Sequence, residues 1–465
     1  MSADGTRQLG HVGGVHLQLL AEKTGLAEAL TRAMRRPGFR PAHARGQVLV
    51  DLACAIVLGA VAIGDIAVLE HQRGVLGPVA SAATAWRTLD EVGELQQRRI
   101  AVARAAVRRR AWKLLEERPE GFPWTVVDGR PLAGWTVLDS DATPVPCASE
   151  KEGAAGTYKK GVFGLCPLLV YCDNTGEMLA HQLRPGDAGC NDTADNIEIF
   201  RQAVEQLPGP YRRKVLFRTD RAGFSCGLLK WIADCGGRVH PSYRWEYSTG
   251  WSFTGREMDA VLAVDALEDR TSRVLWEPAL EADGTVREKA FVVEITGLLG
   301  DLDTWPKGHR VFVRREPLHP RYAKDASAYE REHGVRLTAF ATNTPGRQAA
   351  WLDLRHRGHC RVEPKIRDSK AESLARFPSR FMKINQAWLT ATALACDLRN
   401  WLQLLGCQGA MARATPKTLR YRFLHVPAVL VRGQRRRRLK IPATWPWAEQ
   451  IVEAFRRIRA LPAPT

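Results

Sequence analysis

The sequence predicts an α/β protein: a β-sheet core with a helical amino-terminal domain before it, a β-rich insertion within it and a basic carboxyl-terminal tail. Residues 1–115 carry helical periodicity, short apolar runs typical of strands begin at Trp135, and a second group of alternating runs divides the core. The predicted boundaries are 1–115, 116–244, 245–336, 337–408 and 409–465.

The amino-terminal domain is predicted from runs such as VHLQLLAEKTGLAEALTRAMRR and AVARAAVRRRAWKLLEER, which have helical spacing. Small polar residues precede a helical pattern at 81–92, as in a helix that presents its start to DNA, although generic helix packing explains the pattern equally well. The longest apolar stretch, 52–63, is far shorter than the roughly 20 residues that span a bilayer, so we expect a buried helix.

The core begins with three β-rich runs, WTVLDSDATPV, GLCPLLVYCD and EMLAHQLRPG, which fit strands joined by hairpins. A helix over 195–206, the apolar strand KVLFRTD, the helix CGLLKWIADCG and the strand RVHPSYR follow. The order βββαβαβ is that of a ribonuclease-H-like fold.

The predicted insertion, 245–336, contains the alternating runs RVLWEPAL, AFVVEITGLL and HRVFVRRE, separated by Gly and Asp. A strand LTAFATN then leads into helical sequence up to about Gly406. These two patterns define the insertion and the second part of the core.

Charge points to a polyanionic partner. Lysine and arginine outnumber aspartate and glutamate by 68 to 50, which gives a formal charge of +18. Nucleic acid is the commonest partner of such a chain, because neutralising phosphates releases counterions. No G-x-x-x-x-G-K-[ST] loop indicates a nucleotide cofactor.

Cellular context follows from what else the sequence lacks. The start MSADGTRQLGHVGG has no charged segment followed by an apolar one, so we expect no signal peptide, no membrane association and a cytoplasmic protein. Ten cysteines without a Cys-x-x-Cys pair fit neither a zinc ribbon nor a disulfide framework, so reduced thiols are expected.

Two aspartates, Asp141 in VLDSDAT and Asp220 in VLFRTD, stand at the ends of predicted apolar strands. Neighbouring strands that end in aspartate place both carboxylates together, and such a pair binds Mg²⁺. Taken singly, each acid is more simply explained as a turn or cap residue.

A third carboxylate would complete a site for two magnesium ions, which Mn²⁺ would replace. Glu363 in HCRVEPKIRDSK is the candidate, and at about 3.6 residues per turn Arg367 and Lys370 share its helical face. Those cations suit a DNA backbone. Pro364 indicates that the helix begins or bends at Glu363.

At this point the sequence resembles a known family. The blocks SEKEGAA-TYK-G and LRPG-AG-N, with VLFRTDRAGF and RVEPKIRDSK downstream, closely resemble bacterial insertion-sequence transposases of the family numbered 1380. That family belongs to the DDE group, which resembles ribonuclease H in fold. The resemblance covers nearly the whole chain.

The resemblance implies that Asp141 is the first catalytic acid, with Asp139 as the fallback, and that Asp220 is the second. Related cut-and-paste transposases carry the third acid in a helix reading Tyr-x-x-Arg-x-x-x-Glu-x6-Lys, which aligns with His356, His359, Glu363 and Lys370. The glutamate and lysine match, whereas histidines replace the tyrosine and the arginine. His359 is retained as a candidate phosphate contact.

Further DNA contacts are expected around these acids. The insertion of related transposases holds a flipped base with an aromatic side chain, which makes Trp245 and Trp251 candidates, although packing within the insertion explains both equally well. The loop 149–160 presents a set of side chains suited to a DNA backbone, namely Lys151, Tyr158, Lys159 and Lys160.

Three further features admit two explanations each. Arg184 and Asn191 would position DNA or metal ligands, or they would fix the hairpin. The run 435–438 would contact phosphates, or it would be a solvated tail.

The resemblance implies a transposase that cuts at the inverted repeats of its own element and joins the 3′-hydroxyl ends to target DNA. Its partners would be double-stranded DNA and a second copy of the chain, because two ends must be handled together. The alternatives are a ribonuclease-H-like nuclease without strand transfer and a DNA-binding descendant that has lost catalysis.

Overall fold

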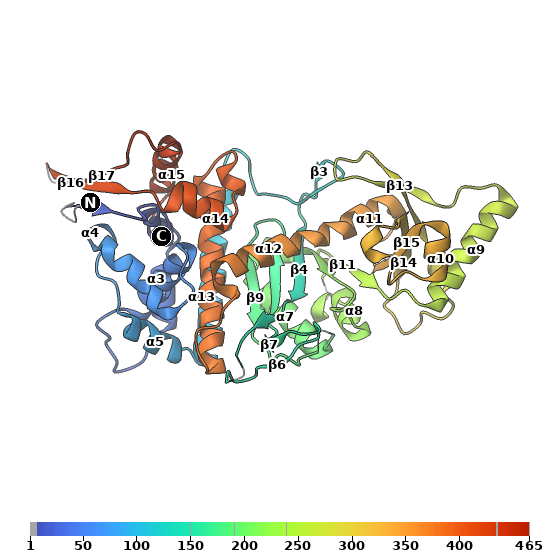
Figure 1. Ribbon diagram of the computed structural model, residues 1–465, viewed down its shortest axis with the longest axis horizontal. Coiled ribbons are helices and arrows are strands. Elements are labelled where there is room, and N and C mark those ends of the chain that lie inside the picture. The colour runs from blue at the N-terminus through green and yellow to red at the C-terminus, as the bar shows by residue number, and fades with distance from the viewer. Residues whose placement is uncertain (1–6, 149, 190, 239, 434–435, 465) are drawn as a thin grey trace.

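The computed structural model describes residues 7–148, 150–189, 191–238, 240–433 and 436–464. Its elements form three parts along the long axis: a helical body that contains both termini, a central sheet, and an extension of that sheet at the far end (Figure 1). No helix in the described ranges has both the length and the apolar character needed to cross a membrane.

The helical body combines the beginning and the end of the chain. Its helices are α1 (Gly14–Thr24), α2 (Leu26–Ala33), α3 (Arg45–Val57), α4 (Arg73–Leu76), α5 (Ala82–Asp90), α6 (Glu94–Glu116), α13 (Met382–Trp401), α14 (Pro416–Leu419) and α15 (Ala448–Ala460). Helix α13 packs on α3 and α15 packs on α1. Strand β1 (Gln8–Leu9) pairs with β16 (Ala428–Gly433), which pairs with β17 (Arg436–Lys440). The predicted carboxyl-terminal tail is thus folded onto the amino-terminal helices.

Apolar periodicity explains why these helices pack. The first turns of α5 are capped by Ser81, whose hydroxyl accepts from the Thr84 N–H, as the small polar residues before it predicted. Twelve residues of α3 are buried, from Arg45 to Val57, because this helix lies at the centre of the body. The expectation of a buried helix at the long apolar stretch is therefore confirmed up to Val57.

The central sheet is mixed. Strand β4 (Thr136–Ala142) pairs antiparallel with β8 (Leu168–Cys172), which pairs antiparallel with β9 (Met178–Gln182). On its other side β4 runs parallel to β10 (Lys214–Thr219), and β10 runs parallel to β11 (Arg244–Trp251). Helices α7 (Thr193–Gln206) and α8 (Cys226–Ala233) connect these strands in the predicted order. The chain segment that connects β4 to β8 forms a small separate sheet of three strands, β5 (Val145–Pro146), β6 (Ala155–Gly156) and β7 (Phe163–Leu165).

One core strand was misplaced by the sequence interpretation. The described part of the segment RVHPSYR is a turn, and the strand is its successor β11, which contains Trp245 and Trp251. The polar segment before Arg244 lacks the apolar alternation that a central strand needs. The core therefore continues beyond the predicted boundary at 244.

The insertion strands extend the central sheet instead of forming their own. Strands β12 (Glu277–Leu280), β13 (Val286–Glu294), β14 (Arg310–Pro317) and β15 (Val335–Thr342) continue it, so that the order is β12-β13-β14-β15-β11-β10-β4-β8-β9. Helix α9 (Gly255–Thr271) projects at this end and α10 (Ala328–His333) lies nearby (Figure 1). A separate hairpin, β2 (Val126–Val127) with β3 (Arg130–Pro131), precedes β4.

A long helical rod crosses the sheet. It consists of α11 (Ala349–Arg357), a 3-10 segment (Gly358–Arg361), α12 (Val362–Ser369) and a π segment (Lys370–Leu374). Proline lacks the N–H that would bond four residues back and is tolerated in the first turn of a helix. Pro364 lies in the first turn of α12, directly after the 3-10 segment, as its position in the sequence indicated.

Buried ion pairs join the helical body to the sheet. Arg108 of α6 donates to Glu177 at 2.7 Å and to Asp397 of α13 at 2.9 Å, and all three side chains are buried. Arg104 also bonds Asp397, at 2.9 Å, and the Trp112 indole donates to Glu177 at 2.6 Å. Because buried charges are tolerated only when paired, this cluster fixes α6 against the β8–β9 hairpin.

Candidate active site

The register of β4 and β10 places the first two candidate acids side by side. Asp139 is paired directly with Arg218 in this parallel ladder. Side chains two residues apart point to the same face of a strand, so Asp141 and Asp220 form the next neighbouring pair on that face. Asp141 is half-buried inside β4 and Asp220 is exposed just beyond β10.

Asp220 is also oriented by the backbone that follows it. Its Oδ1 accepts hydrogen bonds from the Ala222 N–H at 3.0 Å and the Gly223 N–H at 2.8 Å. Such a turn holds one carboxylate oxygen and leaves the other available.

Asp139 lies in a buried ion-pair cluster. Arg218 donates to Asp139 at 2.7 Å and to Asp173 at 3.0 Å, and neither the arginine nor Asp139 is exposed. Burial by itself would raise the pKa of Asp139, but the charge of Arg218 and a hydrogen bond from His359 hold that pKa below its ordinary value. Its oxygens are thus occupied by cations of the protein, which favours Asp141 as the acid that receives an external partner.

Asp141 has the opposite environment. Burial, the charge of Asp220 and the charge of Glu363 raise the pKa of Asp141 to about 7, against a smaller opposing effect of His359. The two other candidate acids are therefore close enough to act on it. A carboxylate whose pKa is raised by burial and by neighbouring carboxylates is typical of a functional site.

Glu363 is exposed in the first turn of α12, which packs against β4. The helix is held there by three of its neighbouring side chains. His359 Nδ1 lies 3.0 Å from Asp139 Oδ1, Arg361 Nε lies 3.2 Å from Asp173, and Lys365 Nζ lies 2.7 Å from Asp173 and 3.6 Å from Asp139. The cluster beneath the acids therefore also anchors the segment that carries Glu363.

Lys370 lies on the other side of Asp141. Its Nζ donates to Thr143 Oγ1 at 2.7 Å and to the Pro144 carbonyl at 3.3 Å, directly after β4. Burial and the charge of Lys159 lower the pKa of Lys370, while the charge of Asp141 partly opposes them. Lys159 and Lys370 thus lie near Asp141, whereas Arg367 points to solvent.

The three acids do not stand at ligand distance. Among the residues that the structure describes, no three His, Cys, Asp or Glu side chains form a group that would hold a metal ion. The donor types nevertheless suit a hard divalent cation, because carboxylate oxygens are its preferred protein ligands.

The loop after β4 contains the other side chains that were predicted to contact DNA. Lys151 donates to the Ser379 carbonyl at 2.9 Å and Tyr158 donates to the Ala142 carbonyl at 2.8 Å. Lys159 and Lys160 are exposed. Residue 149, the first of this predicted loop, lies outside the described residues.

Arg184 fixes a hairpin. It is buried, and it donates to the Cys166 carbonyl at 3.3 Å, the Gly189 carbonyl at 2.9 Å and Asp195 at 3.1 Å. The packing explanation that the sequence left open accounts for these contacts. Asn191 is exposed nearby.

His356 packs against β15 and β11. It is half-buried, stacks on Phe340 with 4.8 Å between ring centroids, and has Nδ1 3.0 Å from Ser248 Oγ. Burial lowers the pKa of His356 well below its ordinary value, so this side chain is a neutral packing residue.

Trp245 and Trp251 are packed inside the sheet. They are 3% and 6% exposed; the Trp245 indole donates to the Arg212 carbonyl at 2.8 Å and the Trp251 indole to Glu257 at 3.0 Å. A base cannot stack on a side chain that is covered in this way. The structure favours the packing explanation that the sequence left open for both residues.

Three important side chains were missed by the sequence interpretation: Arg218, Asp173 and Lys365. A signal existed for the first, because an arginine inside the apolar strand KVLFRT must find a carboxylate. The other two come from the β8–β9 turn and from α12, and their meeting depends on how the rod crosses the sheet.

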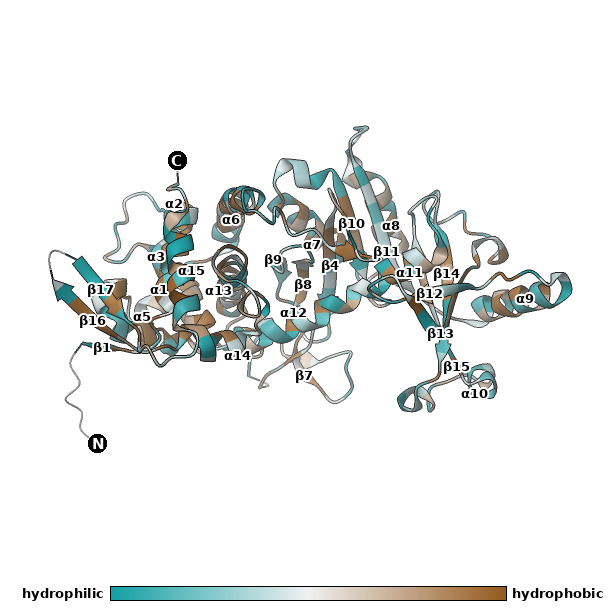
Figure 2. Ribbon diagram, turned by 90° about the horizontal axis from the view of Figure 1, so that it is seen from above, coloured by the Kyte–Doolittle hydropathy of each residue, from teal (hydrophilic) through white to brown (hydrophobic). Residues whose placement is uncertain are grey.

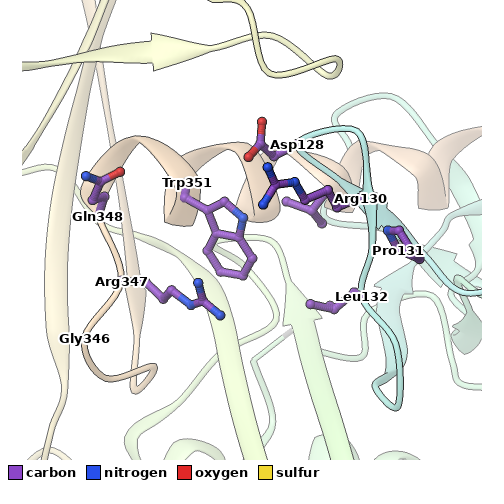
Figure 3. Close-up of a pocket in the computed structure, with 9 residues that line it drawn as sticks. Asp128, Arg130, Pro131, Leu132, Gly346, Arg347, Gln348 and Trp351 are labelled. Atoms are coloured by element: carbon purple, nitrogen blue, oxygen red, sulfur yellow. The ribbon is translucent and has the colours of Figure 1, made fainter.

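A separate cavity of about 420 Å³ lies beside α11 (Figure 3). Its walls come from the hairpin before β4 and from the loop after β15, and Trp351, Arg130 and Arg347 line it. The hairpin lies before the start of β4, whereas Asp141 lies near the end of β4 and Asp220 directly follows β10. This cavity is not part of the candidate active site.

Among the solved structures that match, one aligns over 89% of this chain and 79% of its own. It is the piggyBac transposase synaptic complex with hairpin DNA, at 10% identity and a TM-score of 0.39. Similarity at that level carries no inference for this chain. No curated protein matches the chain significantly.

The family comparison is decisive. The family described as Transposase DDE domain group 1 matches residues 1–463, which is almost the whole chain. The match includes the β4 and β10 acids, the insertion and the rod that carries Glu363. The protein is therefore a member of the transposase family with a group 1 DDE domain.

Proposed function

We propose that this protein is a DNA transposase that cuts at the terminal inverted repeats of its insertion sequence and joins the resulting 3′-hydroxyl ends to target DNA. The observation that carries the proposal is the register of β4 and β10, which sets Asp141 beside Asp220 with Glu363 acting on the same carboxylate. The family match supports the reaction class.

The sheet supports a ribonuclease-H-like core. Its strands lie in the order β9-β8-β4-β10-β11, with β8 antiparallel to its neighbours and the last three parallel. That arrangement matches the strand and helix order predicted from the sequence. The proposed domains keep the insertion as an extension of this core and the amino-terminal helices as a DNA-binding region.

Asp141, Asp220 and Glu363 are the proposed ligands of two magnesium ions, for which manganese would substitute. When bound, such a pair activates the attacking oxygen and stabilises the leaving oxygen of a phosphodiester. Like charges repel, so we expect the three carboxylates to come together around a common site only when divalent cations neutralise them.

The cations of the protein would hold the DNA backbone. Lys159 and Lys160 are exposed on the loop after β4, Arg367 is exposed on α12, and Lys370 and His359 flank the acids. Phosphate contacts of this kind position a duplex without reading its sequence. Because two ends of one element must be joined together, we propose a homodimer in the DNA complex.

The test is a cleavage and strand-transfer assay on labelled DNA that carries the element's end, with Mg²⁺ or Mn²⁺. The parent is compared with Asp220→Ala and Glu363→Ala, and Glu449→Ala serves as the matched control at an exposed carboxylate of α15. We expect metal-dependent joining by the parent and the control, and loss of both cutting and joining in the two acid variants.

The same assay separates the alternatives. Cutting without joining would identify a nuclease, and end binding without cutting would identify a DNA-binding protein. Cutting that survives both acid substitutions would place the active site elsewhere.

A further inference from the structure

A row of unpaired cations lies on the hairpin formed by β16 and β17. In this antiparallel pair Arg438 stands opposite Val431 and Lys440 stands opposite Val429. Alternate residues share a face, so Arg436, Arg438 and Lys440 form one line, with about 7 Å between neighbours. All three are exposed, and Val429 beneath them is 41% exposed. Nothing among the described residues covers this face.

The opposite face of the hairpin is apolar at one end and positively charged at the other. Near the helical body, Leu430 lies opposite Leu439, and Leu430 is buried in the main core. Towards the tip, Arg432 lies directly opposite Arg437. Like charges directly opposite one another destabilise a strand pair, so the pair of Arg432 and Arg437 lowers the stability of the hairpin.

These five cations also lack acidic partners. Within the described ranges none of the five, Arg432, Arg436, Arg437, Arg438 and Lys440, forms an ion pair, and only Arg437 has a side-chain hydrogen bond, to the Gly74 carbonyl at 3.3 Å. Some exposed cations elsewhere in the described ranges have acidic partners, namely Arg201 with Glu198, Lys383 with Asp90 and Arg456 with Glu453. Others, such as Arg87 and Arg109, do not. The hairpin is distinguished by its density, because five such cations lie on two short paired strands.

Protection of a sheet edge is the competing explanation. Strand β17 is the last of the sheet β1-β16-β17, and lysine and arginine on an edge strand prevent pairing with another chain. That requirement is met by charge of either sign. It does not account for a single sign along the row or for arginine facing arginine.

We propose that the β16–β17 hairpin is a second DNA-binding surface, which contacts the phosphate backbone of duplex DNA independently of sequence. The proposal rests on the proposed function. The hairpin projects from the helical body at the end of the molecule opposite the insertion, with the central sheet between them (Figure 1), and its strand β17 is mainly hydrophilic (Figure 2). It therefore holds a stretch of duplex other than the one at the acids.

The test is equilibrium binding of duplex DNA over a series of salt concentrations, without divalent cations. One variant replaces Arg436, Arg438 and Lys440 with glutamine, and a second replaces them with glutamate. The matched control replaces Arg201, Lys383 and Arg456 with glutamate, which makes the same change in net charge as the glutamate variant at exposed cations that already have acidic partners. Thermal unfolding of each variant checks that the fold is retained.

Each lost phosphate contact lowers the slope of log affinity against log salt by about 0.9, so three contacts lower it by about 2.7. We expect that decrease in the glutamine variant, on the element's end and on unrelated duplex alike, and weaker binding still in the glutamate variant. The control should keep the parent's slope.

The glutamate variant keeps a charged edge, which separates DNA binding from edge protection. Parent-like affinity and slope in that variant, with the fold retained, would overturn the proposal. A loss of affinity equal in the control and the hairpin variants would also overturn it, because net charge alone would then explain binding. If hairpin variants lose binding while the parent never cuts DNA, the proposed chemistry fails and the hairpin proposal stands.

Discussion

Two neighbouring pairs on the same strands of the sheet have opposite electrostatics. Asp139 and Arg218 form a fully buried ion pair, whereas Asp141 and Asp220, one step further along, are two carboxylates facing each other. The first pair neutralises itself and the second does not. Position along one strand face therefore separates Asp139, which is bound by an arginine of the protein, from Asp141, which we propose as a metal ligand, although the two aspartates are only two residues apart.

The largest expected effect is on the rate of DNA cleavage when the pair of Asp141 and Asp220 is changed. Asp141→Asn should reduce DNA cleavage by about 1,000-fold or more, because an amide cannot replace a carboxylate as a ligand for a divalent cation. Its thermal stability should not fall. A cleavage time course beside a melting curve checks both, and a variant that cuts normally would remove Asp141 from the proposed site.

For the buried pair of Asp139 and Arg218 we expect a larger effect on folding stability than on DNA cleavage. Asp139→Asn leaves Arg218 without its charged partner, and breaking a buried pair in this way costs about 3–5 kcal/mol of folding free energy. Chemical denaturation measures that loss. The variant should lose activity only as far as it unfolds, so a stable and inactive Asp139→Asn would reverse the roles assigned to the two aspartates.

A smaller effect is expected where Lys365 anchors the helical rod to the buried ion-pair cluster. Lys365→Met removes the contacts of α12 with Asp173 and Asp139, which lets Glu363 shift relative to Asp141. Small misplacements of a catalytic group reduce rates steeply, so we expect about a tenfold lower rate at saturating DNA with little change in DNA affinity. Lys365→Arg should restore most of the rate. A variant with a normal rate would show that the ion pairs do not position Glu363.

The smallest effect concerns stability and pH. The folded-state pKa of Asp141, about 7, lies above its ordinary value of 3.8, so the folded protein binds this proton more tightly than the unfolded chain. Below about pH 4 both states are protonated and no difference arises. The penalty to the folded state grows as pH rises from about 4 to 7 and is fully present above pH 7. Asp141→Asn should therefore melt at a higher temperature than the parent at pH 8 and equally at pH 4. Equal melting at both would contradict the raised pKa.

Several features of the site were predictable from the sequence because they depend on local pattern. Apolar strands ending in VLDSDA and VLFRT predicted β4 and β10, and their parallel pairing brings Asp141 to Asp220. The choice between Asp139 and Asp141 was not predictable from alternation, since both lie on one face. The partner across the ladder, Arg218, distinguishes them.

Other features depend on tertiary context. The insertion strands read as a separate subdomain because alternation reports a half-buried strand without saying which sheet it joins. Helix α9 was not expected, since its sequence lies among strand-like runs. Trp245 and Trp251 could be assigned to DNA or to a core with equal ease until β11 placed both between packed elements.

The buried cluster of Arg104, Arg108, Glu177 and Asp397 limits how this chain could be divided by protein engineering. Cutting between α6 and the sheet would leave Glu177 and Asp397 in one fragment and both arginines in the other, each in an apolar surface without a counter-charge. Exchanging the amino-terminal helices for those of another transposase would meet the same obstacle unless all four side chains moved together. The amino-terminal helices and the central sheet can thus be transferred to another protein only as one unit.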